Sequence, residues 1–235
     1  PMRRLSHLLC GLSAAALLTA AAPAMAEMAA TPPASAAAAN AANVFTYQDM
    51  IPANRLGDPQ VSPDGAWVVY SVTSTDVVAN RRSSKLYIQS LKGEGEARVL
   101  PISEGGANTA RWGKDGTLYF LSSRSGSSQV WASNDKGETA TAITSLPTDV
   151  NAYRVNDQGN AVVVSLAVYP DAENLAASVA RGVQEAERKS TGKVYDRMFV
   201  RHWDTWNDHT QNHLFVVGLG ANAAEPVWVT KGFDG

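Results

Sequence analysis

The stretch Gln60-Val-Ser-Pro-Asp-Gly-Ala-Trp-Val-Val-Tyr-Ser-Val72 contains two short β-rich runs joined by a turn. Within Ser62-Pro-Asp-Gly65, proline presets φ for the second position of a type I turn, aspartate tolerates the third, and glycine supplies the positive φ that leads out. From Trp67 to Val72, successive side chains fall alternately on two faces, which is the period of a β-strand. The stretch therefore predicts a β-hairpin.

Two further stretches repeat this pattern. The turn Trp112-Gly-Lys-Asp-Gly116 precedes the strand-like run 117–121, and Val155-Asn-Asp-Gln-Gly159 precedes the run 161–165. The three turn glycines are 51 and 43 residues apart, and a four-stranded propeller blade takes roughly 40–50 residues. The spacing therefore predicts an internal repeat of blades.

A second landmark supports the repeat. The run Lys85-Leu-Tyr-Ile-Gln-Ser-Leu-Lys-Gly93 matches Gln129-Val-Trp-Ala-Ser-Asn-Asp-Lys-Gly137, and its distance from the turn glycine is 7 residues longer in the first unit. A loop insertion around 76–84 accounts for that difference. The pattern predicts an all-β fold, a partial β-propeller of about three four-stranded blades at about 58–102, 107–147 and 149–231.

The third unit contains a long insertion. Leu214, in the third copy of the second landmark, lies 55 residues after its turn glycine, whereas the other units need 21 and 14. The insertion therefore occupies about 170–211. Leu175, Val179 and Val183 recur in it at helical spacing, which predicts an amphipathic helix. Long loops on a rigid scaffold often carry function.

The first 26 residues have the layout of a cleavable signal peptide. Arg3 and Arg4 precede the short apolar run 8–22, and Ala24-Met-Ala26 forms an A-x-A cleavage site. The alternative is a membrane anchor, but the apolar run is too short to span comfortably. We expect cleavage after Ala26, a disordered Ala/Pro-rich spacer at 27–43, a propeller segment at 44–235, and a periplasmic or secreted location without membrane attachment.

Composition excludes several functions. Charged residues make up 18% of the 235 residues and the formal net charge is −2, so nothing indicates a nucleic-acid partner. The single cysteine, Cys10, lies in the leader, where the apolar run follows instead of preceding it, as lipidation would require. The mature chain thus has neither disulfides nor cysteine-bound zinc. We expect no cofactor.

Catalytic motifs are not found in the chain. No G-x-S-x-G nucleophile elbow occurs outside the leader, and the leader's Gly11-Leu-Ser-Ala-Ala15 lacks the last glycine. His209 and His213 have the H-x3-H spacing that binds a metal on a helix. The surrounding Asn and Asp residues favour a turn, so we expect solvated loop histidines and no metal site.

One constellation in the insertion is a candidate substrate-binding site. Arg201, His202, Trp203 and Asp204, with Trp206, place charges and aromatic rings on a loop. The packing interpretation, in which the rings hold the insertion against the blade and Asp204 pairs with Arg201, is the favoured alternative. In the functional interpretation the loop faces a ligand cavity, and a carboxylate there receives a substrate amino group.

Three blades cannot close a ring, because propellers have about 4–8 blades. An open array would leave an unpaired edge that natural proteins avoid. We therefore expect the sequence to be the N-terminal part of a longer protein.

At this point the pattern resembles a known family. Arg55-Leu-Gly-Asp-Pro-Gln-Val-Ser-Pro-Asp-Gly65, the insertion run 194–206 and His213-Leu-Phe-Val216 resemble the N-terminal half of bacterial prolyl oligopeptidase-superfamily exopeptidases, in the dipeptidyl aminopeptidase/acylaminoacyl peptidase branch. The Ser-Pro-Asp-Gly turn alone also occurs in TolB-type propellers. The resemblance implies a propeller of seven or eight blades capping a C-terminal α/β-hydrolase domain, whose catalytic Ser, Asp and His are expected beyond Gly235.

The resemblance predicts the N-terminal fragment of a secreted or periplasmic serine exopeptidase. Its partners would be short peptide substrates and its own hydrolase domain, with the propeller gating access. The chain alone should be inactive. The alternatives are a non-enzymatic, TolB-like periplasmic propeller that binds protein partners, which the insertion disfavours, and a central-metal propeller hydrolase, for which no recurring His/Asp/Glu set exists.

Overall fold

The computed structural model describes residues 44–93, 95–195, 198 and 200–233. The chain divides into two units, Pro1–Phe45 and Thr46–Gly235, and the architecture below is that of the second. The predicted signal peptide and spacer lie outside the described residues. Among the described residues, no helix has the length and apolar character needed to cross a membrane.

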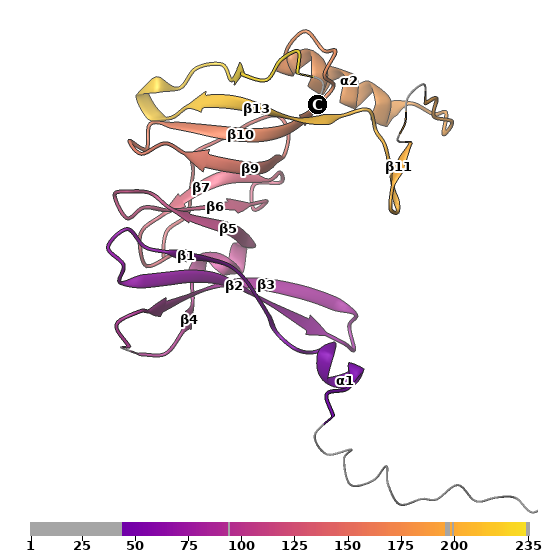
Figure 1. Cartoon of the computed structure of the whole chain (residues 1–235). Helices are drawn as coiled ribbons and strands as arrows, with labels where there is room; N and C mark the ends of the chain where they lie inside the picture. Colours follow the sequence, from indigo (N-terminus) through magenta and orange to yellow (C-terminus); the bar gives the residue numbers. More distant parts are fainter. Residues whose placement is uncertain (1–43, 94, 196–197, 199, 234–235) are drawn as a thin grey trace, which may run out of the picture. The chain divides into compact units, whose positions relative to one another are not determined.

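Three four-stranded antiparallel sheets make up most of the described chain (Figure 1). They follow one another in sequence, each in the order first, second, third and fourth strand. Their strands are β1 (Arg55–Val61), β2 (Trp67–Asp76), β3 (Arg81–Ser90) and β4 (Arg98–Val99); β5 (Ala107–Trp112), β6 (Leu118–Ser122), β7 (Gln129–Ser133) and β8 (Thr141–Ala142); and β9 (Val150–Val155), β10 (Ala161–Val168), β13 (Gln211–Gly218) and β14 (Val227–Trp228). This arrangement confirms the predicted all-β, partial-propeller fold.

Few helices accompany these sheets. The short helix α1 (Tyr47–Met50) precedes β1, and the 3-10 helices η2 (Pro101–Gly105) and η3 (Gly220–Asn222) lie between strands. At α1, Thr46 and Asp49 form a capping box, which satisfies backbone N–H groups that a helix start leaves unpaired.

The repeated turn has the predicted geometry. The Gly65 N–H donates to Ser62 O at 2.9 Å, and the Ser62 N–H donates to Trp67 O at 2.8 Å. The second and third blades repeat the first of these bonds from Gly116 and Gly159, at 3.1 and 3.0 Å. All three glycines have positive φ, at 68°, 82° and 67°, a region that glycine enters without the Cβ penalty of other residues.

The first strands of neighbouring blades run in the same direction. Asp58 contacts Arg111, and Gln60 contacts Trp112 further along both strands. At the next boundary, the Val150 N–H donates to Ser128 O, so β9 begins beside the β6–β7 connection. The connections from second to third strand therefore lie on one face of the array, here called the insertion face. The repeated turns lie on the opposite face, here called the turn face.

Apolar side chains fill the spaces between blades. One cluster joins the first and second blades and includes Val69, Leu100 and Phe120, all fully buried. A second cluster joins the second and third blades around Val130, Val164 and Phe215. Since full burial of one such side chain contributes roughly 1.5–3 kcal/mol, these clusters are the main source of cohesion between blades.

Gly137 shows how closely the first two blades approach each other. Its φ is +67°, and a Cβ at this position would lie 2.8 Å from Leu100 Cδ2. The Ile102 N–H also donates to Gly137 O at 3.0 Å. Gly93 ends the equivalent turn of the first blade with φ +77°, yet nothing lies within 4 Å of its Cβ position.

We predict that Gly137→Ala destabilises the protein more than Gly93→Ala. Both substitutions place a Cβ at positive φ, which costs about 1–2 kcal/mol. Only Gly137→Ala also overpacks the boundary with Leu100, which adds roughly 1–3 kcal/mol. Urea unfolding of the two variants measures the difference, and equal losses would contradict the close approach of the blades.

Candidate functional site in the third blade

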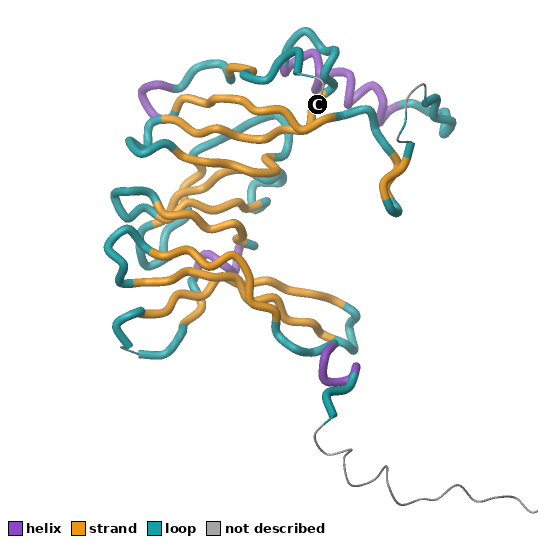
Figure 2. The backbone as a smooth tube through the Cα atoms, in the orientation of Figure 1, coloured by secondary structure: helices purple, strands orange, loops and turns teal. Residues whose placement is uncertain are grey.

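The connection between β10 and β13 contains the elements from which the site is built. It holds helix α2 (Leu175–Glu187) and a small hairpin of β11 (Arg201–His202) and β12 (Thr205–Trp206). Figure 2 shows this segment as one helix, loops and a short pair of strands, on the insertion face. No other blade in the described chain has a comparable connection, because β6 and β7 are separated by only a short turn.

Helix α2 begins with a capped turn and packs one face on the third blade. Asn174 Oδ1 accepts a hydrogen bond from the Ala177 N–H at 2.8 Å, as an N-cap residue should. Leu175 packs against the core and Ser178 is buried. Val183, however, is 53% exposed. The predicted apolar stripe of α2 therefore does not face the blade along its whole length, because its last residue points to solvent.

A polar contact compensates for the burial of Ser178. Its Oγ accepts a hydrogen bond from the Tyr169 N–H at 2.9 Å, directly after β10. Arg181, one turn further along α2, donates to both carboxylate oxygens of Asp171 at 2.8 and 2.9 Å. Its guanidinium also lies 4.2 Å from the centre of the Tyr169 ring. These contacts fix α2 on the end of β10.

A cavity of about 610 Å³ opens between α2, the segment after it and the turn before β13. This volume falls within the roughly 300–1,000 Å³ that is typical of small-molecule sites. The lining residues are Tyr169, Arg181, Glu185, Ala186, Arg188, Ser190, Thr191, Gly192, Lys193, Val194, Asp208 and His209.

Two carboxylates that line this cavity affect the ionisation of the Tyr169 hydroxyl. Burial is the largest cause that raises the pKa of Tyr169; the negative charges of Glu185 and Asp208 raise it further, and the positive charge of Arg181 lowers it. Both carboxylates therefore lie close enough to the Tyr169 hydroxyl to affect its ionisation. Burial alone would also raise the pKa of Asp208, but hydrogen bonds from Thr210 N and Oγ1 outweigh it and lower that pKa. Asp208 is thus ionised at neutral pH.

Basic groups lie in the same wall. Arg188 is 3.4 Å from Glu185 and donates to Gly192 O at 3.1 Å. The charge of Lys193 helps to lower the pKa of Asp208, and both residues line the cavity. The cavity wall therefore carries two carboxylates, Glu185 and Asp208, among the basic groups Arg181, Arg188 and Lys193.

The five residues predicted from sequence all lie on the β11–β12 hairpin, and all are exposed. Arg201 and Trp206 are cross-strand partners, and the guanidinium lies 5.5 Å from the Trp206 ring centre. Asp204 accepts a hydrogen bond from Thr205 Oγ1 at 3.4 Å. Among the described residues no ion pair joins it to Arg201. His202 contacts Trp203 edge-on at 6.3 Å.

A stack of aromatic rings connects the hairpin to the cavity. Tyr195 stacks on Trp206 with 6.2 Å between ring centres, and on His209 at 5.3 Å. Its hydroxyl donates to Asn207 O at 2.9 Å. Since His209 lines the cavity, these ring contacts connect the hairpin to the cavity wall.

Trp203 occupies the first position of the hairpin turn. Its φ is 52° and its side chain is 83% exposed. For a bulky residue this left-handed region costs about 1–2 kcal/mol because Cβ approaches the following carbonyl oxygen. Glycine or asparagine would fit this turn with less strain.

The expectation of two solvated loop histidines is wrong for His213. This residue is the third of β13 and is only 2% exposed. Its Nδ1 lies 3.0 Å from Thr230 O, and its ring meets Trp228 edge-on at 5.2 Å. The alternation of β13 directs it inward, a pattern that the polar residues around it concealed. Among the described residues, no group of three or more possible ligands could hold a metal ion.

Sequence patterns did not indicate the tyrosine and the two carboxylates that line the cavity. Tyr169, Glu185 and Asp208 come from the end of β10, the last turn of α2 and the turn before β13. No spacing rule connects these three segments. The signal that could have drawn attention to them was the length of the insertion itself.

Comparisons with known proteins agree with this architecture. No family model matches the chain. Dipeptidyl-peptidase 5 of Porphyromonas endodontalis is 25% identical over 82% of this chain and 26% of its own length. A probable dipeptidyl-peptidase 5 of Arthroderma benhamiae is 29% identical over 80% of this chain and 26% of its own.

Solved structures show the same fold. An acylaminoacyl peptidase of Pyrococcus horikoshii has a TM-score of 0.55 at 12% identity, over 78% of this chain and 26% of its own. The AtxE2 isopeptidase has a TM-score of 0.54 at 19% identity, over 80% of this chain and 32% of its own. The chain matches the N-terminal propeller region of prolyl oligopeptidase-type peptidases. It spans about a quarter of the length of the curated relatives.

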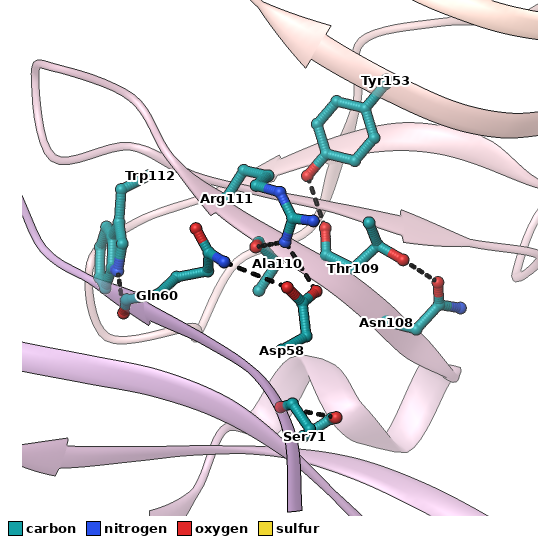
Figure 3. Close-up of polar contacts among 10 residues, drawn as sticks. Asp58, Gln60, Ser71, Asn108, Thr109, Ala110, Arg111, Trp112 and Tyr153 are labelled. Atoms are coloured by element: carbon teal, nitrogen blue, oxygen red, sulfur yellow. Dashed lines mark hydrogen bonds and ion pairs between the residues drawn. The ribbon is translucent and has the colours of Figure 1, made fainter.

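In this propeller, side chains of each blade cap backbone groups of the preceding one (Figure 3). Trp112 Nε1 donates to Gln60 O at 3.2 Å. Arg111 pairs with Asp58 at 2.7 Å, and Gln60 Nε2 donates to the other oxygen of that carboxylate at 3.1 Å. Because both charged groups are partly exposed, the pair contributes at most about 1 kcal/mol. Its main effect is to orient the two strands.

A tyrosine side chain connects the second and third blades. Tyr153 in β9 is buried, and its hydroxyl donates to Thr109 O at 2.8 Å (Figure 3). The pairing of β5 with β6 shifts register between Asn108 and Arg111, and the pairing of β1 with β2 shifts between Gly57 and Gln60. Asp58 and Thr109, inside these bulges, both have positive φ. Bulges of this kind direct side chains and carbonyls out of the ladder.

We predict that Tyr153→Phe lowers stability by about 1 kcal/mol, the typical net contribution of one hydrogen bond. Burial raises the pKa of Tyr153 well above its usual value of 10. Above about pH 10 the unfolded chain therefore loses this proton first, and stability falls as pH rises.

Tyr153→Phe should accordingly show a shallower loss of stability between pH 10 and 11.5 than the wild type. Urea unfolding at several pH values measures both effects. Tyr47→Phe, at an exposed position, is the matched control. An unchanged slope in Tyr153→Phe would show that this hydroxyl is not buried against the second blade.

Proposed function

We propose that the chain is the propeller part of a secreted or periplasmic serine exopeptidase that acts on short peptides, of dipeptidyl- or acylaminoacyl-peptidase type. The observation that carries the proposal is the charged cavity in the insertion, on a propeller whose curated relatives are dipeptidyl peptidases. The predicted signal peptide at 1–26 supports the proposed location. In this proposal the propeller limits access to peptides that are short.

The cavity provides groups that suit a free peptide N-terminus. Glu185 and Asp208 both line the cavity, so an ammonium group bound in it would meet two carboxylates, of which Glu185 also pairs with Arg188. The last turn of α2 adds the partial negative charge of a helix C-terminus. Lys193, which also lines the cavity, would donate a hydrogen bond to a peptide carbonyl or carboxylate oxygen. These cavity carboxylates are better placed for the ammonium group than Asp204 on the exposed hairpin.

The bond-breaking step belongs to residues beyond this sequence. In the proposed mechanism a serine attacks the scissile carbonyl, a histidine takes the serine proton, and an aspartate orients the histidine. Backbone N–H groups stabilise the oxyanion. The propeller contributes by holding the peptide amine at a fixed distance from that serine, which sets how many residues are removed.

We predict that the full-length protein hydrolyses dipeptidyl-coumarin substrates, that a serine-directed fluorophosphonate abolishes this activity, and that the 1–235 chain alone is inactive. Glu185→Gln and Asp208→Asn should each raise KM for substrates with a free amino group about tenfold or more, the effect of losing a charged hydrogen bond. N-acetylated substrates, if cleaved, should be unaffected by these variants.

Asp157→Asn is the matched control. Asp157 is an exposed carboxylate that pairs with Lys114 on the turn face. Equal effects of all three variants would argue against the cavity as the amine site. A full-length protein without hydrolytic activity, or a reading frame without a nucleophile elbow, would contradict the peptidase and favour a partner-binding propeller.

A further inference from the structure

Trp203 has features that the fold does not explain. It occupies the tip of the β11–β12 hairpin with a φ of 52°, where a residue without a bulky side chain would be less strained. Its side chain is 83% exposed. Among the described residues, its ring meets that of His202 edge-on, with 6.3 Å between ring centres. The strain is therefore not offset by burial in the described part of the chain.

Ring contacts connect the hairpin that carries this indole to the cavity. The Arg201 guanidinium covers Trp206, Trp206 stacks on Tyr195, and Tyr195 stacks on His209. His209 is part of the cavity wall. A continuous series of ring contacts thus connects the base of the hairpin to the cavity. These contacts support the hairpin that carries Trp203 at its tip.

We propose that Trp203 is a specificity-determining residue, whose indole packs against an apolar side chain of a peptide bound at the insertion. The inference rests on the proposed peptidase function and extends it to the choice of substrate. Residues in strained backbone conformations occur preferentially at ligand contacts. Aromatic faces pair favourably with other aromatic and aliphatic side chains.

The size of the apolar tip favours a peptide over a folded protein. His202 and Asp204 flank Trp203 in sequence, so the turn itself offers one apolar side chain between two polar ones. A stable protein interface buries roughly 800 Å² on each partner, far more than one indole provides. One side chain of a short peptide, by contrast, matches it in size. Asp204 beside it would also favour a peptide with a positive charge.

The test compares full-length wild type with Trp203→Gly and Trp203→Phe. The measured quantity is kcat/KM for dipeptidyl-coumarins that carry phenylalanine, leucine or glycine at each of the two positions. Trp203→Gly should reduce the preference for phenylalanine and leucine over glycine by about fivefold at one of these positions, as expected for the loss of one aromatic contact. Trp203→Phe should retain most of that preference.

Stability distinguishes a binding role from a structural one. Because glycine relieves the positive-φ strain, Trp203→Gly should have an unfolding midpoint equal to or above that of the wild type. Val78→Gly is the matched control, since Val78 is the fully exposed tip residue of the β2–β3 hairpin on the same face. It should leave the preference unchanged.

Each result has a clear meaning. Unchanged preference in Trp203→Gly, with active enzyme, overturns the role of Trp203 and leaves the peptidase proposal intact. A lowered midpoint in Trp203→Gly also overturns it, because the indole would then be structural. Absence of hydrolysis by the wild type overturns both proposals.

Discussion

The arrangement of the blades depends on how the inner edge of each sheet is covered. The first strand of every blade has one edge without a strand partner in the described chain. Side chains of the following blade cap this edge: Trp112 donates to Gln60 O, and Tyr153 donates to Thr109 O. These bonds satisfy exposed carbonyls and at the same time fix neighbouring first strands in the same direction. All connections between second and third strands consequently lie on one face.

That common face explains why an insertion in one blade can form a site. A rigid scaffold keeps the ends of β10 and β13 in place, and helix α2 can therefore close a cavity above Tyr169. The insertion supplies the charged residues of the cavity, and the blade fixes the positions of the two ends of the insertion. Such a division lets the loop vary while the blades stay constant. The exposed hairpin extends from the same wall, through the stack of Tyr195 on His209.

The sequence predicted the parts of the structure that depend on local chemistry. Turn glycines such as Gly65 need positive φ, and their spacing therefore identified the blades. Other features depend on contacts between distant residues and had no local signal. Arg111 meets Asp58 across 53 positions, and the cavity joins three separate segments. The buried state of His213 was missed because its polar neighbours indicated a turn, and Val183 was expected to face the blade although α2 directs it to solvent.

We propose that peptides bind at the insertion face of this propeller. Hydrogen–deuterium exchange of the full-length protein, with and without a slowly cleaved dipeptidyl substrate, tests it most directly. The account predicts slower exchange in 169–195 and 200–210, with no change in the three turns of the opposite face. Slower exchange confined to those turns, or no change anywhere in the propeller, would contradict it.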